Sequence, residues 1–556
     1  MHALPNQSRG RWWWRSLAIA ATVIATASVM STARIFSATY DEPAHLAAGI
    51  QWLSTGWYYY DLQHPPLARV IAALGPYLAG MRTVGKPDMW TEGAALLGSG
   101  AHYEHMLALA RYGAAIFLIV GALAVWLWGR RLLGEAGAAI ATVFLVTNPT
   151  MLAHAGLATN DAAVAAMGTL ALYATLRWLE RPDWPRSILL GGAFALAIGA
   201  KFSALPFVGS ALMAGYLLRG FVGRSWSVPN PRASADTKRV PSRWASIGAV
   251  VVVMLFAIWA LYRFHIGHIW LVRFRVPAPA LWAGLDTFLV HGGTGHPGFL
   301  LGTARDHGWW YYFPIALLVK SPLPLLFLSM IGGYAAWLEL RRARHWEAAV
   351  PICGALAMLA IATQVPVNIG VRHVLPIYPL LAIAAAQGAL LLWRRVVDRK
   401  LARATVLVAC ACAVIIPLRA YPDYLPYFNP FAGADPENIL VDSNLDWGQD
   451  LYRLRDTLRA RGVTEPVAIA YFGSTDPHAV GIPNAVPMLP GRTTAHWIAV
   501  SRTYLAGEWV GGVYKGLLRY APVAPIGKSM LLWHFVPASA APGASSTRAT
   551  SPRSGQ

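Results

Sequence analysis

The sequence predicts an all-α membrane protein with about eleven transmembrane helices and a small α/β domain near its C-terminus. Of its 556 residues, 56% are hydrophobic and only 13% are charged, about half the charged fraction of a typical soluble protein. The mean hydropathy is +0.43. The apolar residues also form runs that approach the roughly 20 residues needed to cross a bilayer. Together these observations exclude an ordinary soluble protein.

Hydropathy along the chain places the individual spans. Apolar runs that end at polar or basic residues predict crossings at 17–37, 108–128, 136–156, 160–179, 187–200, 203–218, 244–264, 311–337, 348–366, 373–393 and 402–418. An alternative treats 187–218 as one broken crossing, which would reverse the orientation of everything after it. A second alternative treats the first apolar run as a cleaved signal peptide, but its length favours an uncleaved anchor.

The basic residues indicate the orientation of these spans. Much of the net charge of +20 lies in short loops between apolar runs, as expected for orientation signals rather than for nucleic-acid binding. With a cytoplasmic N-terminus, eleven spans place every basic loop cluster on the cytoplasmic side, whereas the broken-crossing alternative puts the last three outside. The sequence therefore predicts an integral protein of a bacterial cytoplasmic membrane with an extracytoplasmic C-terminus.

The predicted spans divide the chain into four parts. We expect a cytoplasmic N-terminus at 1–16 and a transmembrane region at 17–418, with long outer loops at 38–107 and 265–310. An extracytoplasmic domain at 419–537 and a disordered tail at 538–556 are expected to follow. In the extracytoplasmic domain, 439–462 predicts a strand, a turn and an amphipathic helix, and 467–473, 496–501 and 530–535 predict strands. Asn444 or Asp446 is expected to cap that helix. Residues 63–81 predict an amphipathic interfacial helix, and 224–243 a cytoplasmic linker.

Ionisable side chains gather on the outer side of this topology. The first outer loop begins with YDEPAH (40–45) and continues with HPPLAR (64–69). The other outer positions are Asp161, Lys201, His291, His296, Arg372 and His373. Lys320 lies inside a predicted span, and because a charge that faces lipid is costly, we expect it to face the protein interior. Any chemistry is therefore expected outside the cytoplasm.

Six motifs in order resemble the family-39 glycosyltransferases of the GT-C superfamily. They are YDEPAH, HPPLAR, HAGLATNDAAVAAM (154–167), KFSALP (201–206), KSPLP (320–324) and VRHVLPIYP (371–379). This family includes protein O-mannosyltransferases and the aminoarabinose transferase that modifies lipid A. The resemblance implies transfer of a hexose or pentose from a polyprenyl-phosphate donor to a lipid, glycan or protein outside the cytoplasm. No MIR-type insert is recognisable, which weakens a protein as the specific acceptor.

The resemblance also implies roles for the outer residues. Asp41 is expected to be the general base of an inverting transfer, because a base must take the acceptor proton. Glu42 would orient Asp41, hold a metal or bind acceptor, and Asp161 is the second acidic position, although it could instead cap a helix. Donor phosphate would be bound by Lys201, Arg372, Lys320 and His373. Acceptor or loop roles fall to His45, His64, His291 and His296.

The sequence is also compatible with a metal cofactor and with two other function classes. Some relatives hold a divalent metal ion with a loop carboxylate and a histidine, so a metal is possible. Cys353, Cys410 and Cys412 lie in apolar runs and indicate neither a disulfide framework nor a metal cluster. A ligase or polymerase of polyprenyl-linked oligosaccharides would rely on outer-loop Arg and His instead of Asp41 and Glu42. A lipid-linked substrate transporter would carry mid-bilayer charges and internal repeats, and only Lys320 favours it.

Overall fold

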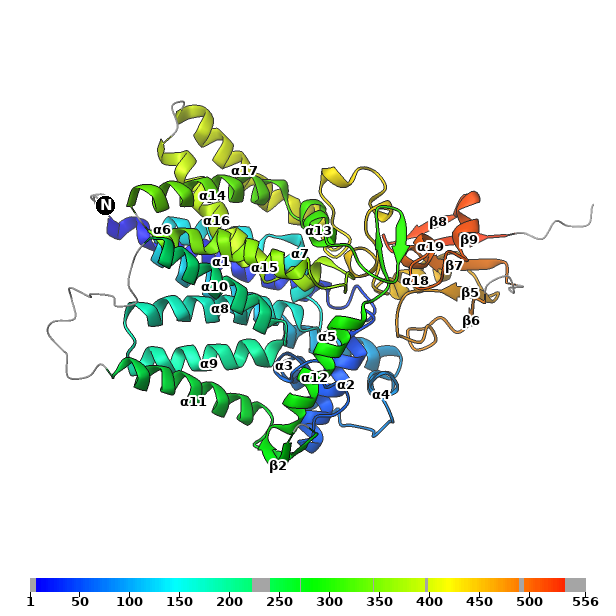
Figure 1. Ribbon diagram of the computed structural model, residues 1–556. Coiled ribbons are helices and arrows are strands. Elements are labelled where there is room, and N and C mark those ends of the chain that lie inside the picture. Colours follow the sequence, from blue (N-terminus) through cyan, green and yellow to red (C-terminus); the bar gives the residue numbers. More distant parts are fainter. Residues whose placement is uncertain are drawn as a thin grey trace, which may run out of the picture.

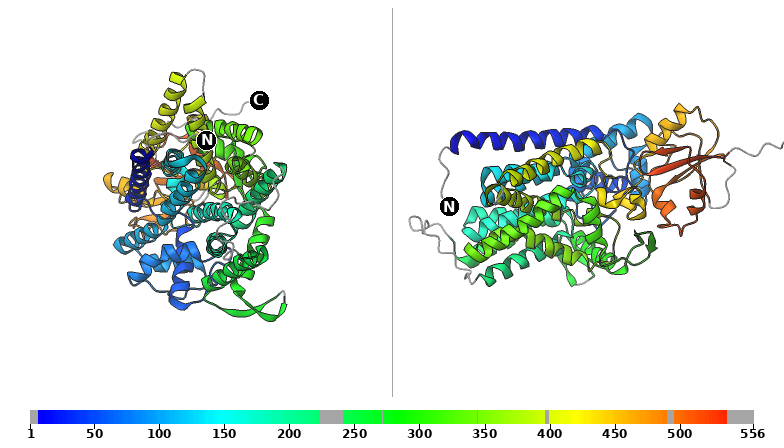
Figure 2. Two further views of the ribbon diagram at one scale, coloured as in Figure 1. Left: turned by 90° about the vertical axis from the view of Figure 1, so that its left-hand side faces the viewer. Right: turned by 90° about the horizontal axis from the view of Figure 1, so that it is seen from above.

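The computed structural model describes residues 7–222, 241–270, 272–343, 345–395, 399–489 and 495–535. A bundle of long helices forms the larger part, and a small mixed α/β domain lies at one end of it, with the described N-terminal helix beginning near the other end (Figure 1). Seen from above, α1 lies along one edge of the bundle and the sheet lies beyond the helix ends (Figure 2). Most of the predicted linker at 224–243 and the predicted tail at 538–556 lie outside the described residues.

Most of the predicted spans coincide with apolar helices, but the span at 311–337 is broken near Ser321 and the span at 136–156 is broken near Asn148. The bundle consists of α1 (Gln7–Thr32), α6 (Ile116–Val146), α8 (Asp161–Glu180), α9 (Trp184–Ala200), α10 (Ala204–Phe221), α11 (Arg243–Leu261), α13 (Tyr312–Lys320), α14 (Leu323–Ala343), α15 (Val350–Ala362), α16 (Ile377–Arg395) and α17 (Arg399–Ala420). In the described residues, eight helices are long and apolar enough to cross a membrane. One of them, Gly100–Val146, covers the predicted span 108–128 and the first half of 136–156, and has a break at Gly134, where φ is 80°.

Two predicted crossings are shorter than this criterion. They are Trp184–Ala200 and Trp346–Ala362, which are apolar helical segments of 10 to 17 residues. The polytopic all-α fold class with a small C-terminal α/β domain is thereby confirmed, and the length and composition of the helices are those of an integral membrane protein.

Small residues bring the central helices into close contact. A Cβ atom added to Gly332 in α14 would lie 1.9 Å from the carbonyl oxygen of Ala384 in α16. A Cβ atom on Gly388 in α16 would lie 2.1 Å from the carbonyl oxygen of Leu328. Because apolar burial does not drive helices together within lipid, such close backbone packing supplies much of the attraction. It places α16 at the centre, in contact with α6, α14 and α15.

The two long outer loops are themselves folded. The first contains α2 (Glu42–Thr55), α3 (Leu67–Leu78), α4 (Met89–Leu97) and α5 (Gly100–Ala114). The second contains β1 (Ile266–Ile269), β2 (Val272–Pro277), α12 (Pro279–Thr294), β3 (Gly298–Leu300) and β4 (Thr303–Arg305). The predicted helix at 63–81 is α3, which packs against α2 and α5. Gly49 permits this contact, since its Cβ would lie 2.3 Å from the carbonyl oxygen of Arg69.

The C-terminal domain is a five-stranded mixed sheet with strand order β6-β5-β7-β9-β8. Its elements are α18 (Leu451–Ala460), β5 (Val467–Ala470), β6 (Ala485–Pro487), β7 (Trp497–Ser501), α19 (Arg502–Ala506), β8 (Ala524–Ile526) and β9 (Met530–His534). Strand β5 is parallel to β6 and β7, and β9 is antiparallel to β7 and β8. The helix and three strands match the prediction, but β6 and β8 were not predicted.

The strand predicted at the start of 439–462 was wrong. Residues 439–441 do not form a strand, and short 3₁₀ turns at Pro436–Asn438 (η6) and Asp442–Asn444 (η7) replace it. The apolar side chains of Leu440 and Val441 are buried. Leu440 packs into the core of the bundle, and Val441 packs against Phe299 and Leu445, so this strand-like apolar run is buried without joining a sheet.

Candidate functional site

Four of the sequence-predicted residues form a continuous chain of ion pairs. Arg372 Nη1 lies 3.0 Å from Asp41 Oδ2 and 3.7 Å from Asp161 Oδ2, and Lys201 Nζ lies 2.7 Å from Asp161 Oδ1. Asp161, Lys201 and Arg372 are buried, whereas Asp41 is partly open. We call Asp41, Arg372, Asp161 and Lys201 the ion-pair chain. Buried charges are tolerated when they are paired in this way.

Each member of the ion-pair chain stands at a helix end. Asp41 immediately precedes α2, Asp161 begins α8, and Lys201 follows the last residue of α9. Arg372 belongs to the 3₁₀ turn η4 (Val371–Val374), which leads towards α16. Because helix ends place polar groups at the boundary of an apolar bundle, four distant segments deliver charges to one place. Asp161 lies next to the N-cap Asn160, but its carboxylate faces Lys201 and Arg372 instead of capping α8.

A turn of the C-terminal domain holds Arg372. We call residues 442–449 the DSNLDWGQ turn. The Nε of Arg372 donates to Ser443 Oγ at 3.1 Å, and the guanidinium lies 4.2 Å from the ring centre of Trp447. The backbone N–H of Val371 donates to Asn444 Oδ1 at 2.9 Å. Hydrogen bonds and a cation–π contact thus fix the guanidinium from the side of the C-terminal domain.

The same turn also holds the segment that carries Asp41. The N–H of Tyr40 donates to the carbonyl oxygen of Trp447 at 2.9 Å, and the N–H of Ser37 donates to that of Gln449 at 3.0 Å. The DSNLDWGQ turn therefore contacts both sides of the Asp41–Arg372 pair. The sequence analysis did not predict that this turn would hold the Asp41–Arg372 pair. The run of Asp, Ser, Asn and Gln around one Trp was the only sequence feature that could have indicated it.

The predicted helix-capping role in this turn is wrong. Asn444 Nδ2 donates to Tyr312 Oη at 3.0 Å, and Asp446 Oδ2 accepts from the N–H of Thr503 at 2.9 Å. The N-cap of α18 is Asp450, whose side chain does not cap the helix. Both predicted capping residues instead fasten the turn to neighbouring elements.

Glu42 points away from the ion-pair chain into a buried pair with Arg111. Arg111 donates to Glu42 at 2.7 and 2.8 Å, and the N–H groups of Thr39 and Ala158 donate to it at 2.8 and 2.9 Å. Burial opposes the charged form, but Arg111 and these donors hold the pKa of Glu42 below its usual value. The side chain ties YDEPAH to the 154–167 segment. Its oxygens are occupied, so they offer no position for a metal or an acceptor.

The first-loop histidines lie next to Arg69 and interact electrostatically with the ion-pair chain. His45 Nδ1 accepts a hydrogen bond from Arg69 Nε at 2.9 Å, and Arg69 also pairs with Asp61. The rings of His45 and His64 are 5.6 Å apart. Burial, together with the Arg69 charge, lowers the pKa of His45, and burial lowers that of His64 to about 3. Both imidazoles are therefore neutral at physiological pH.

Several buried polar atoms near Asp161 lack a hydrogen-bond partner among the described residues. They are His154 Nδ1, His373 Nε2 and both amide atoms of Asn160. His154 and His373 both interact electrostatically with Asp161. Because buried polar atoms are rarely left unpaired, this group is suited to the oxygens of a bound ligand. The structure therefore brings His373 close to the predicted phosphate-binding cations.

The second-loop histidines and Lys320 border the ion-pair chain without belonging to it. His291 and His296 have ring centres 6.0 Å apart, and His296 meets Trp509 edge to face at 4.7 Å. Lys320 Nζ donates to the carbonyl oxygens of Leu425 and Asn444 at 2.7 and 2.6 Å. Lys320 is buried within protein, as predicted, but it binds backbone carbonyls instead of joining the ion-pair chain.

Among the described residues, no group of three or more His, Cys, Asp or Glu side chains is arranged to hold a metal ion. Asp41 and Asp161 each already contact a cation at hydrogen-bond distance.

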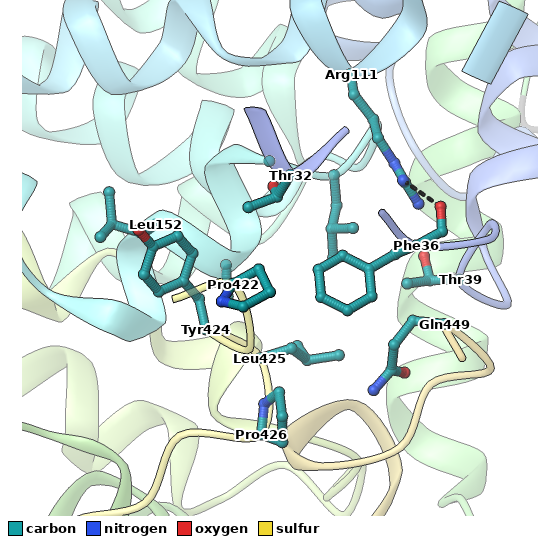
Figure 3. A pocket seen from close by; sticks show the side chains of 13 residues that line it. Thr32, Phe36, Thr39, Arg111, Leu152, Pro422, Tyr424, Leu425, Pro426 and Gln449 are labelled. Carbon is teal, nitrogen blue, oxygen red and sulfur yellow. Dashed lines mark hydrogen bonds between the residues drawn. The ribbon is translucent and has the colours of Figure 1, made fainter. Parts of the chain in front are cut away.

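A small cavity lies beside this region but is not large enough for a lipid donor. It sits between the C-terminal end of α1, α7 (Pro149–Ala155) and the 422–426 segment (Figure 3). Its volume is about 30 Å³, and Arg111 Nη1 donates to the carbonyl oxygen of Phe36 at its edge. A space of this size holds about one or two water molecules.

Comparisons with known proteins identify the fold. A family model described as dolichyl-phosphate-mannose-protein mannosyltransferase matches residues 105–262. The whole chain is similar to the crystal structure of ArnT from Cupriavidus metallidurans in the apo state, with 14% identity, coverage of 92% of this chain and 97% of that chain, and a TM-score of 0.50. The chain has a GT-C fold. The predicted resemblance to GT-C glycosyltransferases is thereby confirmed.

Further solved structures are similar to this GT-C chain at lower TM-scores. ArnT from the same organism bound to undecaprenyl phosphate is 14% identical, covers 94% of this chain and 98% of that chain, and has a TM-score of 0.48. An Archaeoglobus fulgidus oligosaccharyltransferase tethered with an acceptor peptide is 12% identical and has a TM-score of 0.47. The match covers 92% of this chain and 73% of that chain. A search of curated proteins found no match.

Proposed function

We propose that the protein is an inverting glycosyltransferase that moves a hexose or pentose from a polyprenyl-phosphate donor to an acceptor hydroxyl outside the cytoplasm. The ion-pair chain carries this proposal. It presents one partly open carboxylate, Asp41, beside two buried cations, Arg372 and Lys201. Glycosyl transfer from a phosphate requires a proton acceptor and cations for the departing phosphate. The family model and the GT-C fold support the same class of reaction.

In the proposed reaction the acceptor hydroxyl attacks the anomeric carbon of the donor sugar. Asp41 accepts the hydroxyl proton while the bond between the anomeric carbon and the phosphate oxygen breaks. The bond electrons leave with the polyprenyl phosphate, and the new glycosidic bond forms on the opposite face of the sugar. The configuration at the anomeric carbon is therefore inverted.

Arg372 and Lys201 are proposed to bind the donor phosphate. A guanidinium offers two parallel N–H donors to phosphate oxygens, and an ammonium adds a compact charge. In the structure Arg372 Nη1 contacts Asp41 and Asp161. Donor phosphate would take over part of these contacts, which frees Asp41 to face the acceptor. Asp161 keeps both cations in place throughout and is a positioning residue.

The acceptor is proposed to enter from the side of the second outer loop and the C-terminal domain. His296 interacts electrostatically with both Asp41 and Arg372. Its ring packs on Trp509, which is 45% exposed. His291 is adjacent to His296. This side of Asp41 thus carries aromatic and imidazole groups that are suited to a hydroxylated acceptor.

Comparison of lipids from a deletion strain and its parent tests the proposed donor. If the proposal is right, a polyprenyl phosphate that carries one sugar accumulates in the deletion strain, and mass spectrometry detects it. Transfer of that sugar by purified protein then restores the normal pattern. Accumulation of a polyprenyl-diphosphate oligosaccharide instead would contradict the proposal and support a ligase.

A further inference from the structure

A tryptophan of the C-terminal domain is held in a strained and half-exposed position. Trp509 lies in the turn that follows α19, and its backbone φ is 67°. A bulky residue rarely adopts a positive φ, whereas Gly507, Gly511 and Gly512 in the same turn adopt it without strain. Strained backbone of this kind is characteristic of functional sites. The turn thus carries a large exposed ring at a position where glycine would fold more easily.

The residue before Trp509 is also costly to the fold. Glu508 is buried, and neither of its carboxyl oxygens has a hydrogen-bond partner among the described residues. Buried polar atoms are rarely left unpaired. Burial and the neighbouring carboxyl groups of Asp442 and Asp446 raise the pKa of Glu508 well above its usual value. Two consecutive residues therefore break rules of stability, which is expected where function determines the sequence.

Stacked rings connect Trp509 with the segment that carries Asp41. Trp509 stacks on Phe472 with ring centres 5.8 Å apart, and Phe472 stacks on Tyr40 with ring centres 5.2 Å apart. Tyr40 directly precedes Asp41. The side chain of Trp509 also hydrogen-bonds to Asp442 in the DSNLDWGQ turn. The exposed indole is therefore fastened to the elements that hold the proposed base.

The groups beside Trp509 suit a neutral, hydroxylated ring. His296 meets the indole edge to face at 4.7 Å, and His291 lies next to His296. Burial lowers the pKa of both histidines, so their imidazoles are neutral at physiological pH. An exposed indole can pack against the C–H face of a sugar, and neutral imidazoles donate to and accept from hydroxyl groups. Neither imidazole supplies the positive charge that a phosphate on the acceptor would require.

We propose that Trp509 is the binding platform for a neutral sugar ring of the acceptor, with His296 beside it as a hydrogen-bonding partner of the sugar hydroxyls. The acceptor is then a glycan and not a phosphorylated lipid or a peptide. This assignment rests on the proposed glycosyltransferase function and narrows the acceptor class within it. Trp509 touches no reacting atom, and its role is to select and hold the acceptor near Asp41.

Saturation-transfer NMR with the full-length protein in nanodiscs tests this proposal without any donor. The probes are methyl glycosides of neutral hexoses and pentoses, a glucose phosphate and a serine-containing tripeptide. The wild type should bind a neutral glycoside more tightly than it binds the phosphate or the peptide. Trp509→Gly should weaken glycoside binding about tenfold, because the aromatic face is lost. Trp509→Phe keeps a smaller ring and should retain part of the affinity.

Two features of these variants separate a lost platform from a lost fold. Glycine adopts a φ of 67° without strain, so Trp509→Gly should keep its thermal stability. Trp270→Leu is the matched control, because Trp270 is exposed in the turn between β1 and β2 and its replacement should leave glycoside binding unchanged.

Three results would overturn the proposal. They are undiminished glycoside binding by Trp509→Gly, no saturation transfer to any neutral glycoside, and tighter binding of the phosphate or the peptide. Because the readout is acceptor binding, each of these results would leave the accumulation of a polyprenyl-phosphate sugar in the deletion strain unaffected. Failure of the acceptor assignment is therefore distinguishable from failure of the glycosyltransferase proposal.

Discussion

Among the four residues of the ion-pair chain, Asp41 differs from the others in its exposure. Its side chain is 25% exposed, against 8% for Arg372, 9% for Lys201 and 2% for Asp161. A substrate can therefore reach Asp41 directly, whereas Asp161 is enclosed by its two cations. This difference supports the proposed division of roles, in which one carboxylate takes a proton and the other positions the cations.

Substitutions of Asp41 and Arg372 should fail in different ways. Asp41→Asn preserves shape but cannot accept a proton, so single-turnover transfer should fall by about 10²–10⁴-fold while donor binding is largely retained. Arg372→Ala removes a charge-assisted contact, so donor binding should weaken by about 1.5–3 kcal/mol. Donor-lipid binding and single-turnover rates in nanodiscs check both. If Asp41→Asn abolishes donor binding and leaves the chemical step intact, Asp41 is not the base.

Glu42 should prove to be a stabilising residue. Glu42→Gln breaks a fully buried pair with Arg111, so the free energy of unfolding should fall by about 3–5 kcal/mol. Thermal unfolding in detergent measures this. Glu135→Gln is a suitable control, since its partner Arg15 is exposed and its loss should change stability little. If Glu42→Gln keeps full stability but makes activity depend on an added metal, the stabilising role would be contradicted. Glu42 would then be a metal-binding residue, one of the roles expected from the sequence.

At the scale of elements, the DSNLDWGQ turn joins the C-terminal domain to the site. Trp447 provides the ring beneath Arg372, and the turn bonds to the segment before Asp41. Trp447→Leu removes a desolvated cation–π contact worth about 1–2 kcal/mol. The KM for donor should therefore rise, with a smaller effect on kcat. Trp447→Phe should rescue much of this loss because it retains an aromatic face. Steady-state kinetics of both variants check the expectation, and equal defects in them would contradict a positioning role for the ring.

Buried carboxylates should make the C-terminal domain less stable as pH rises. Burial raises the pKa of Asp446, before α18, and of Asp450, at its start, to about 6. Because the folded pKa exceeds the unfolded value near 4, the stabilisation is complete below about pH 4 and is lost as pH rises through 6. Each group should contribute about 3 kcal/mol to this change.

Hydrogen exchange of the β7 and β9 amides at pH 5 and pH 7.5, corrected for intrinsic rates, measures this pH dependence. Asp446→Asn cannot ionise and should reduce the difference between the two pH values. Asp476→Asn, at an exposed position, should leave the difference unchanged. A domain more stable at pH 7.5 than at pH 5 would contradict the expected sign.

For the whole molecule, the proposed orientation determines what each end of the bundle can meet. An accessible tag within 224–243 should report the cytoplasm, and tags near Gly98 or after Pro542 should report the opposite side. Membrane-impermeant labelling of single-cysteine variants in intact cells and in lysed cells checks all three positions. A cytoplasmic C-terminus would place the ion-pair chain on the wrong side for the proposed reaction.

The sequence alone determined the fold class and the candidate residues at helix ends. Apolar runs predicted the spans because crossing a bilayer requires length and composition, which are local properties. Asp41, Asp161, Lys201 and Arg372 could be singled out because each interrupts or ends an apolar run. The predicted helix α18 and strands β5, β7 and β9 also follow from local periodicity. The three-residue strands β6 and β8 were missed because they are too short to show alternation.

Only the tertiary structure decided which of these residues meet. Asp41 and Arg372 are 331 positions apart, and Lys320 and Asn444 are 124 apart. No local sequence pattern indicates that Asp41 pairs with Arg372 while its neighbour Glu42 pairs with Arg111. That choice depends on the pitch of α2 and on the packing of α5, α8 and the DSNLDWGQ turn around it. Partner choice among similar charges is a property of the packed molecule, because each charge must find the nearest group that compensates its burial.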